Sequence, residues 1–333
     1  MGWAGPAAGL ALVLASMALL VGRSVLLAPH LHGVGVKSAP ATSITPVDPQ
    51  PLAPTAPPKP APLSVDWLAG HGQPSLAITS GSAILVDVDT REVMWARDEH
   101  SRRPPASLTK MVTAMVAADL ASSFDQQVTV PVEATTLEWD STFMGLSPGE
   151  VVTVRDLMYG IFLISGNDAA ETLARAFVPR DSFLQLMNDK AAAIGMHDSH
   201  FTNATGLDDP ELRASAYDLA IAAETIETRY PAIMAIAGAR SQVLPQTPTH
   251  KGYALNTFIK LVSTYPGATG LKTGYTDDAG YCVVGTATRG GRHLLVVLLG
   301  GDLGLTTDAT RLLDYGFSEP QPAPFDPSTI PNV

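Results

Sequence analysis

Residues 270–301, GLKTGYTDDAGYCVVGTATRGGRHLLVVLLGG, decide the fold class of this chain of 333 residues. The stretches GLKTGY, GYCVVGTATRG and RHLLVVLLGG are apolar runs of strand length, which predicts three successive strands. Arg289-Gly290-Gly291 separates the last two stretches and is typical of a tight hairpin turn. We therefore expect these two strands to pair antiparallel.

A second strand pair is predicted far upstream, where SAILVDV and REVMWARD flank a turn at Asp89-Thr90. Between the two strand regions, helical spacing of apolar residues predicts helices at 107–120, 153–166, 181–194 and 215–228, and a last helix follows at 307–317. Thr153, Asp181 and Ser215 are the expected N-caps of three of them. Strands at both ends with helices between predict an α+β fold with one sheet that the two ends complete.

The chain divides into four segments. Residues 1–28 contain an apolar stretch without charge from Gly2 to Gly22, which predicts a signal-anchor or a cleaved signal peptide. Residues 29–74 form a proline-rich linker, 75–319 the folded domain and 320–333 a proline-rich tail. This order predicts a domain held at the cell membrane and facing away from the cytoplasm, or an exported one.

Composition excludes several classes of protein. Hydrophobic residues make up 46% of the chain, which is enough for a packed core, and the net charge of −11 comes without a basic cluster. We therefore expect no nucleic-acid partner. Cys282 is the single cysteine, which excludes an internal disulfide and a cysteine-based zinc site.

Ser107-Leu108-Thr109-Lys110 is the first motif that suggests chemistry. If Ser107 lies in the first turn of its helix, residues i and i+3 share a face and the amine of Lys110 lies beside the hydroxyl. A lysine beside a serine is one way to activate a nucleophile. Alone, the motif is better explained as an ordinary polar helix start.

Two further motifs follow in order. Ser165-Gly166-Asn167 interrupts a buried apolar run, where polar groups cost stability unless something uses them; a kink with a local Asn cap would also explain it. Lys272-Thr273-Gly274 lies in a predicted strand, where a cation, a hydroxyl and an open edge suit a peptide that ends in a carboxylate. A charged surface strand is the alternative. All three motifs in this order are uncommon by chance.

Together, S-x-x-K, S-x-N and K-T-G resemble the signature of penicillin-binding proteins and class A β-lactamases. Residues 80–317, with segments such as ASLTKMVTAMVA and GIFLISGNDAAETLA, are similar to the serine-type D-alanyl-D-alanine carboxypeptidases, the low-molecular-weight penicillin-binding proteins of peptidase family S11. The resemblance implies a β-lactamase/penicillin-binding-protein-like transpeptidase fold, an antiparallel sheet flanked by helices with a helical lobe. Many relatives have alanine in place of Gly166, a difference expected to be harmless.

The resemblance also implies roles for individual residues. It assigns catalysis to Ser107, Lys110 and Ser165, and substrate binding to Asn167, Lys272, Thr273 and Tyr275. Ser107 would form an acyl-enzyme with peptidoglycan stem peptides and a covalent adduct with β-lactams. The resemblance implies that this reaction needs neither a metal nor an organic cofactor. Since the chain ends soon after Phe317, without the further domain and anchoring helix that relatives often have, membrane attachment would fall to the N-terminal segment.

Two rival functions remain open. A class A-like β-lactamase would need a glutamate in an E-x-x-L-N pattern between the second and third motifs, and the sequence has none there. A non-catalytic cell-wall-binding protein could keep the same fold. Asn203, in FTNATGL, belongs to a segment that resembles the family, but no chemical role follows for it from the sequence.

Overall fold

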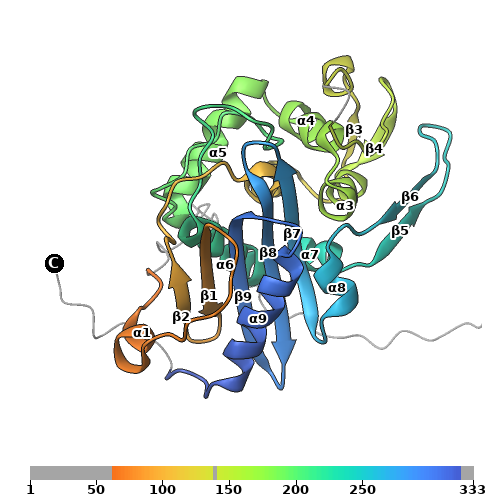
Figure 1. The fold of residues 1–333 in the computed structure, drawn as a ribbon. Helices are drawn as coiled ribbons and strands as arrows, with labels where there is room; N and C mark the ends of the chain where they lie inside the picture. Colours follow the sequence, from red (N-terminus) through yellow and green to blue (C-terminus); the bar gives the residue numbers. More distant parts are fainter. Residues whose placement is uncertain (1–61, 138–140, 324–333) are drawn as a thin grey trace, which may run out of the picture. The chain divides into compact units, whose positions relative to one another are not determined.

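The computed structural model describes residues 62–137 and 141–323 (Figure 1). The segment predicted at 1–28, residues 29–61 of the linker and most of the tail lie outside these residues. Within the two described ranges, no helix combines the length and the apolar character that crossing a membrane requires.

One antiparallel sheet of five strands lies at the centre, in the order β2-β1-β9-β8-β7. Its strands are β1 (Ser82–Asp87), β2 (Glu92–Arg97), β7 (Ala268–Thr276), β8 (Gly280–Arg289) and β9 (Arg292–Gly301). β1 pairs with β9, with Ser82 opposite Leu299, so the two ends of the folded block complete one sheet. Gly290 and Gly291 have φ of +59° and +83°, as a tight hairpin turn requires. The predicted α+β class is confirmed.

Burial on both faces explains why β9 is apolar throughout. Leu295, Val297 and Leu299 belong to one hydrophobic cluster, whereas Leu294, Val296 and Leu298 belong to a second on the opposite face. Successive side chains of a strand point to opposite faces, so a strand buried on both sides shows no polar alternation. Helices α8 (Lys260–Thr264) and α9 (Leu305–Ser318) cover one face, and α6 (Ala216–Arg229) and α7 (Pro231–Ala237) cover the other.

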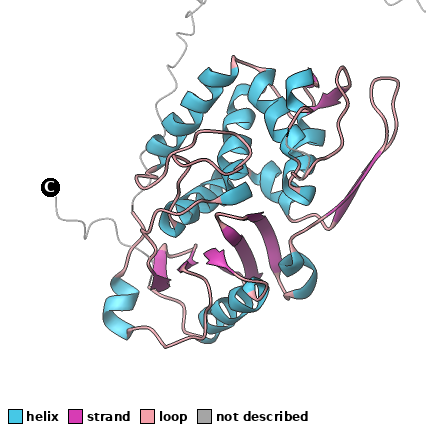
Figure 2. Cartoon of the chain, turned by 45° about the horizontal axis from the view of Figure 1, so that its top comes forward, coloured by secondary structure: helices cyan, strands magenta, loops and turns pink. Residues whose placement is uncertain are grey.

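Four further helices form the predicted helical lobe (Figure 2). They are α2 (Lys110–Leu120), α3 (Val154–Ile164), α4 (Asn167–Ala176) and α5 (Arg180–Ile194). Thr153 caps α3 in a reciprocal capping box with Asp156, and Ser215 caps α6, both as predicted. The predicted cap at Asp181 is wrong. Helix α5 begins one residue earlier, at Arg180, because Pro179 precedes it with an extended ψ of 142° and leaves Asp181 inside the first turn.

Several short elements were not predicted. They are α1 (Asp66–His71), the 3₁₀ turn η2 (Val132–Ala134), the helices α7 and α8, and the strand pairs β3 (Gln127–Thr129) with β4 (Val151–Thr153) and β5 (Ser241–Leu244) with β6 (Tyr253–Asn256). Segments of three to seven residues are too short to show a regular spacing of apolar residues. Their conformation therefore depends on contacts with the rest of the fold.

The folded block begins before the predicted boundary at residue 74. Leu63 and Trp67 are each only 6% exposed and belong to the two hydrophobic clusters. Ser64 exchanges backbone hydrogen bonds with the second strand, donating to Arg91 O and accepting from Val93 N. Residues 63–71, which the sequence analysis placed in the linker, therefore belong to the fold.

This placement predicts different stabilities for two shortened chains. A chain that begins at Ser75 loses the buried side chains of Leu63 and Trp67, which together contribute at least about 3 kcal/mol to the free energy of unfolding. A chain that begins at Pro62 retains them. Urea denaturation of both should show a lower midpoint for the shorter chain, and coincident curves would contradict this boundary.

Candidate active site

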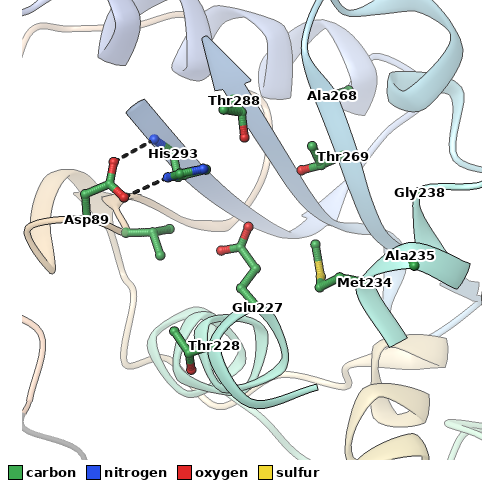
Figure 3. Close-up of a pocket in the computed structure, with 11 residues that line it drawn as sticks. Asp89, Glu227, Thr228, Met234, Ala235, Gly238, Ala268, Thr269, Thr288 and His293 are labelled. Atoms are coloured by element: carbon green, nitrogen blue, oxygen red, sulfur yellow. Dashed lines mark hydrogen bonds and ion pairs between the residues drawn. The ribbon is translucent and has the colours of Figure 1, made fainter. Parts of the chain in front are cut away.

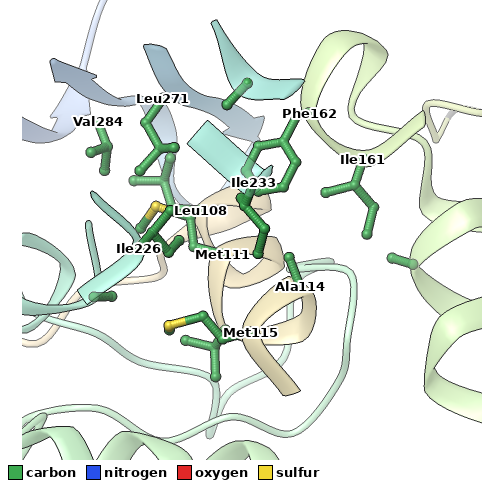
Figure 4. Packing of buried hydrophobic residues seen from close by; sticks show 14 of the residues in the cluster. Leu108, Met111, Ala114, Met115, Ile161, Phe162, Ile226, Ile233, Leu271 and Val284 are labelled. Carbon is green, nitrogen blue, oxygen red and sulfur yellow. The ribbon is translucent and has the colours of Figure 1, made fainter. Parts of the chain in front are cut away.

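The first motif lies in a turn directly before α2. Ser107 occupies the 3₁₀ turn η1 (Ala106–Thr109), and its neighbour Ala106 has a φ of +48°, which non-glycine residues rarely adopt. Leu108 and Met111 anchor this turn in the core, near Leu271 of β7 (Figure 4). The apolar residues on either side thus fix the direction in which Ser107 and Lys110 point.

Three oxygens surround the amine of Lys110, a side chain without exposed surface. Its Nζ lies 2.8 Å from Ser107 Oγ, 2.6 Å from Asn167 Oδ1 and 2.5 Å from the carbonyl oxygen of Thr205. The last two oxygens can only accept hydrogen bonds. A neutral amine has two N–H groups and one lone pair, so once the two carbonyls accept the N–H groups, the lone pair faces the hydroxyl of Ser107.

The environment also favours the neutral amine. Burial lowers the pKa of Lys110 well below its ordinary value, and the positive charge of Lys272 lowers it further, while Asp168 has the opposite effect. A neutral amine beside a serine hydroxyl is able to take its proton.

The second and third motifs meet at Ser165. Ser165 ends α3 in the left-handed conformation, with a φ of +61°, and accepts a hydrogen bond of 2.9 Å from Lys272 Nζ. Lys272 also donates to the carbonyl of Thr273 at 2.7 Å and is 1% exposed. Both partners are uncharged oxygens, and burial lowers the pKa of Lys272 to about 7. The ammonium therefore lacks a counter-charge in these contacts, which a carboxylate ligand would supply.

Strand β7 carries the third motif along the edge of the sheet, next to the turn η1 that contains Ser107. A Cβ on Gly274 would lie 2.8 Å from Ser107 N and 2.9 Å from the Cβ of Ala106, so only glycine lets the turn approach this closely. Tyr275 follows, with its side chain 53% exposed and its hydroxyl bonded to Asp277. Thr273, directly before Gly274, is half-buried.

Asp168 holds a loop over the second motif, a contact that the sequence did not reveal. Its buried carboxylate accepts the backbone N–H groups of Met144, Gly145 and Leu146 at 2.7–2.8 Å. A Cβ on Gly166 would lie 2.9 Å from Met144 N and 3.0 Å from the Asp168 carboxylate. An alanine at Gly166, the residue that many relatives have there, would therefore require this loop to shift.

Asn203 shapes the turn that binds the amine of Lys110. Its Oδ1 accepts N–H groups from Thr205 and Gly206 at 3.2 and 2.7 Å, and its Nδ2 donates to the Leu207 carbonyl at 3.0 Å. Asparagine commonly closes such turns through its own side chain. This preference could have predicted a turn at Asn203 from the sequence. It could not show that the Thr205 carbonyl faces a lysine 95 residues away.

Two of the glutamates considered for a β-lactamase are occupied elsewhere. Glu171 is buried and bonded to Arg175 and Arg180, and Glu224 forms an ion pair with Arg91. These pairs explain both carboxylates without a role in activating water.

The turn at Asn203 generates a prediction. Asn203→Ala should slow acylation of Ser107 on the order of 100-fold, because the Thr205 carbonyl no longer fixes the amine of Lys110. Asn203→Asp keeps the accepting oxygen and should retain more of the rate. The rate of covalent adduct formation with a chromogenic β-lactam measures both.

Asn188→Ala is the matched control, since Asn188 binds the backbone of Phe201 in the same segment without touching the turn. An equal loss of rate in the Asn203→Ala and Asn188→Ala variants would show that general loosening, not the turn, causes the effect.

The sequence matches the family described as D-alanyl-D-alanine carboxypeptidase over residues 69–302. It is 32% identical over 258 residues to D-alanyl-D-alanine carboxypeptidase DacF of Bacillus subtilis, covering 75% of this chain and 65% of that protein. It is 34% identical over 264 residues to D-alanyl-D-alanine carboxypeptidase DacB2 of Mycobacterium tuberculosis, covering 76% of this chain and 89% of the relative.

Solved structures agree with the fold. The crystal structure of a D-alanyl-D-alanine carboxypeptidase from Mycobacterium tuberculosis superposes with a TM-score of 0.69 at 32% identity, covering 76% of this chain and 96% of that one. The Streptomyces K15 DD-transpeptidase gives 0.69 at 27% identity, covering 74% and 100%. The predicted transpeptidase fold is confirmed, and the chain belongs to the D-alanyl-D-alanine carboxypeptidase family, peptidase family S11.

Proposed function

We propose that the protein is a serine hydrolase that removes the terminal D-alanine from peptidoglycan peptides ending in D-Ala-D-Ala. The observation that carries the proposal is the amine of Lys110, which lies 2.8 Å from Ser107 Oγ while two carbonyl oxygens occupy its other positions. A protein that only binds the cell wall has no need for a buried neutral amine beside a serine.

In the first half of the reaction, Ser107 Oγ attacks the carbonyl carbon between the two D-alanines while Lys110 Nζ takes its proton. The backbone N–H groups of Ser107 and Tyr275 receive the negative charge that develops on the carbonyl oxygen. The C–N bond then breaks, and the proton passes through Ser165 to the departing amine of D-alanine. Water attacks the resulting ester while Lys110 takes its proton. The bond between the carbonyl carbon and Ser107 Oγ then breaks, Lys110 returns the proton to Oγ, and the shortened peptide leaves.

Substrate recognition follows from the groups that remain unoccupied. Asn167 Oδ1 accepts from Lys110, which leaves its Nδ2 to donate to a peptide carbonyl of the substrate. The ammonium of Lys272 and the hydroxyl of Thr273 bind the terminal carboxylate, whose charge compensates the buried ammonium. A peptide on the free edge of β7 places its carbonyl between the N–H groups of Ser107 and Tyr275.

The cellular location follows from the same proposal. Peptidoglycan lies outside the cytoplasmic membrane, so the catalytic domain acts there, attached through residues 1–28 or exported after their removal. The apolar stretch from Gly2 to Gly22 and the nine prolines of residues 38–64 support this arrangement.

A serine nucleophile predicts the site of β-lactam attachment. Incubation with penicillin should add one adduct to the protein, mapped by mass spectrometry to the peptide that contains Ser107. Ser107→Ala should form no adduct and release no D-alanine from a pentapeptide, because the attacking oxygen is gone. Ser182→Ala, a change at an exposed serine of α5, is the control and should behave as wild type.

Two results would contradict the proposal. An adduct that persists in Ser107→Ala would place the nucleophile elsewhere. Adduct formation without D-alanine release from any pentapeptide, combined with rapid turnover of penicillin, would favour the β-lactamase.

The lowered pKa of Lys272 predicts that the protein takes up a proton when the substrate binds. This pKa is lowered to about 7, and a bound carboxylate raises it again, so at about pH 8 the complex should take up most of one proton. KM should accordingly increase as the pH rises above about 7. Calorimetry of the Ser107→Ala variant with a D-Ala-D-Ala peptide, in buffers of different ionisation enthalpy, measures the uptake.

A C-terminally amidated peptide is the matched control, since it has no carboxylate to raise the pKa of Lys272. Lys272→Gln should likewise abolish the uptake. The same uptake with the amidated peptide, or in the Lys272→Gln variant, would assign the titration to another group.

A further inference from the structure

A cavity of about 720 Å³ lies at the opposite end of β7 from the candidate active site (Figure 3). Thr269 lines it, six positions before Tyr275, which places the two sites roughly 20 Å apart along the strand. Its walls come from the end of α6, from α7, from the start of β7 and from the residues next to the β1–β2 and β8–β9 turns. Nothing in the proposed reaction uses this cavity.

Glu227 of α6 points into the cavity (Figure 3), and its Oε2 is buried without a hydrogen-bond partner. The other two titratable groups of the lining, Asp89 and His293, are already paired, with 2.7 Å between His293 Nδ1 and Asp89 Oδ1. α7, β7 and β8 contribute no titratable side chain to the wall. Burial raises the pKa of Glu227 to about 7; Asp89 adds to this effect and His293 opposes it.

The rest of the wall is apolar with a few hydroxyls. Val88, Met234 and Ala235 supply carbon surface, and Thr228 and Thr288 supply side-chain oxygens. A half-buried glutamate with one buried and unpaired carboxylate oxygen, next to an apolar wall, matches a molecule with a hydrogen-bond-donating cation at one end and a short hydrocarbon body.

We propose that this cavity binds small primary ammonium compounds, with the ammonium on Glu227 and the hydrocarbon against Val88 and Met234. The ammonium supplies the missing partner of Glu227 Oε2 and forms a charge-assisted hydrogen bond. The separation along β7 makes this site independent of Ser107.

The test uses n-butylammonium as the probe, with 1-butanol as a neutral analogue of the same length. Saturable binding of the ammonium, measured by NMR shifts of amides on α6 and α7, should strengthen about tenfold from about pH 6 to about pH 8, because Glu227 must ionise. Butanol should bind more weakly and without this pH dependence. Acylation of Ser107 by penicillin should be unaffected by the probe.

Two variants keep the test decisive. Glu227→Gln preserves the shape and should weaken butylammonium binding at least tenfold at about pH 8. Ala235→Phe, at an exposed position of α7, should block the cavity sterically. Absence of saturable binding, equal affinity of wild type and Glu227→Gln, or equal binding of butanol would each overturn the proposal. None of these results bears on the reaction at Ser107, which the penicillin adduct reports separately.

Discussion

A fully buried lysine amine that must remain uncharged is the constraint on which the site depends. Burying an unpaired ammonium costs several kcal/mol, so Lys110 is stable in this position as a neutral amine with its N–H groups bonded. The carbonyl oxygens of Asn167 and Thr205 satisfy those two groups. The lone pair then faces Ser107, because the two carbonyl oxygens occupy the other positions around the nitrogen. The contacts that stabilise the buried amine therefore also produce the geometry that the proposed reaction requires.

The surrounding fold serves to hold these oxygens in place. Helix α3 ends at Ser165 in a left-handed conformation, and α4 begins at Asn167. The break between the two helices places the side-chain amide of Asn167 beside the amine of Lys110. Asn203 fixes the turn of the Thr205 carbonyl, and Asp168 secures the loop that covers this break. These polar residues at breaks in secondary structure are locally unfavourable, and the two hydrophobic clusters of the sheet stabilise the protein around them.

The sequence predicted the long strands and helices from the spacing of their apolar residues, and it predicted two helix starts from their capping side chains. The apolar run of β9 predicted a buried strand, and Thr153 and Ser215 predicted helix starts, because capping requires only a side chain and its nearest amides. The predicted cap at Asp181 was wrong because α5 begins at Arg180, directly after Pro179. The linker boundary failed because the burial of Trp67 depends on tertiary packing.

The site shows the same division. The three motifs predicted roles for Ser107, Lys110 and Lys272, and the structure places their side chains in two hydrogen-bonded groups. The contributions of Asn203 and Asp168 could not be predicted, since each acts on backbone groups whose position only the fold determines. The cavity at Glu227 was likewise invisible, because its walls come from segments far apart in the sequence.

The ionisation state of Lys110 tests the account most directly. Protein labelled with ¹⁵N at lysine side chains permits the Nζ resonance of each lysine to be followed with pH, and a Lys110→Arg variant assigns the signal. The account predicts that Lys110 Nζ titrates with a pKa well below the ordinary lysine value, because the amine is fully buried and lies near Lys272. A Lys110 that stays charged at pH 7 and loses its proton only near the ordinary lysine value of about 10.4 would contradict it.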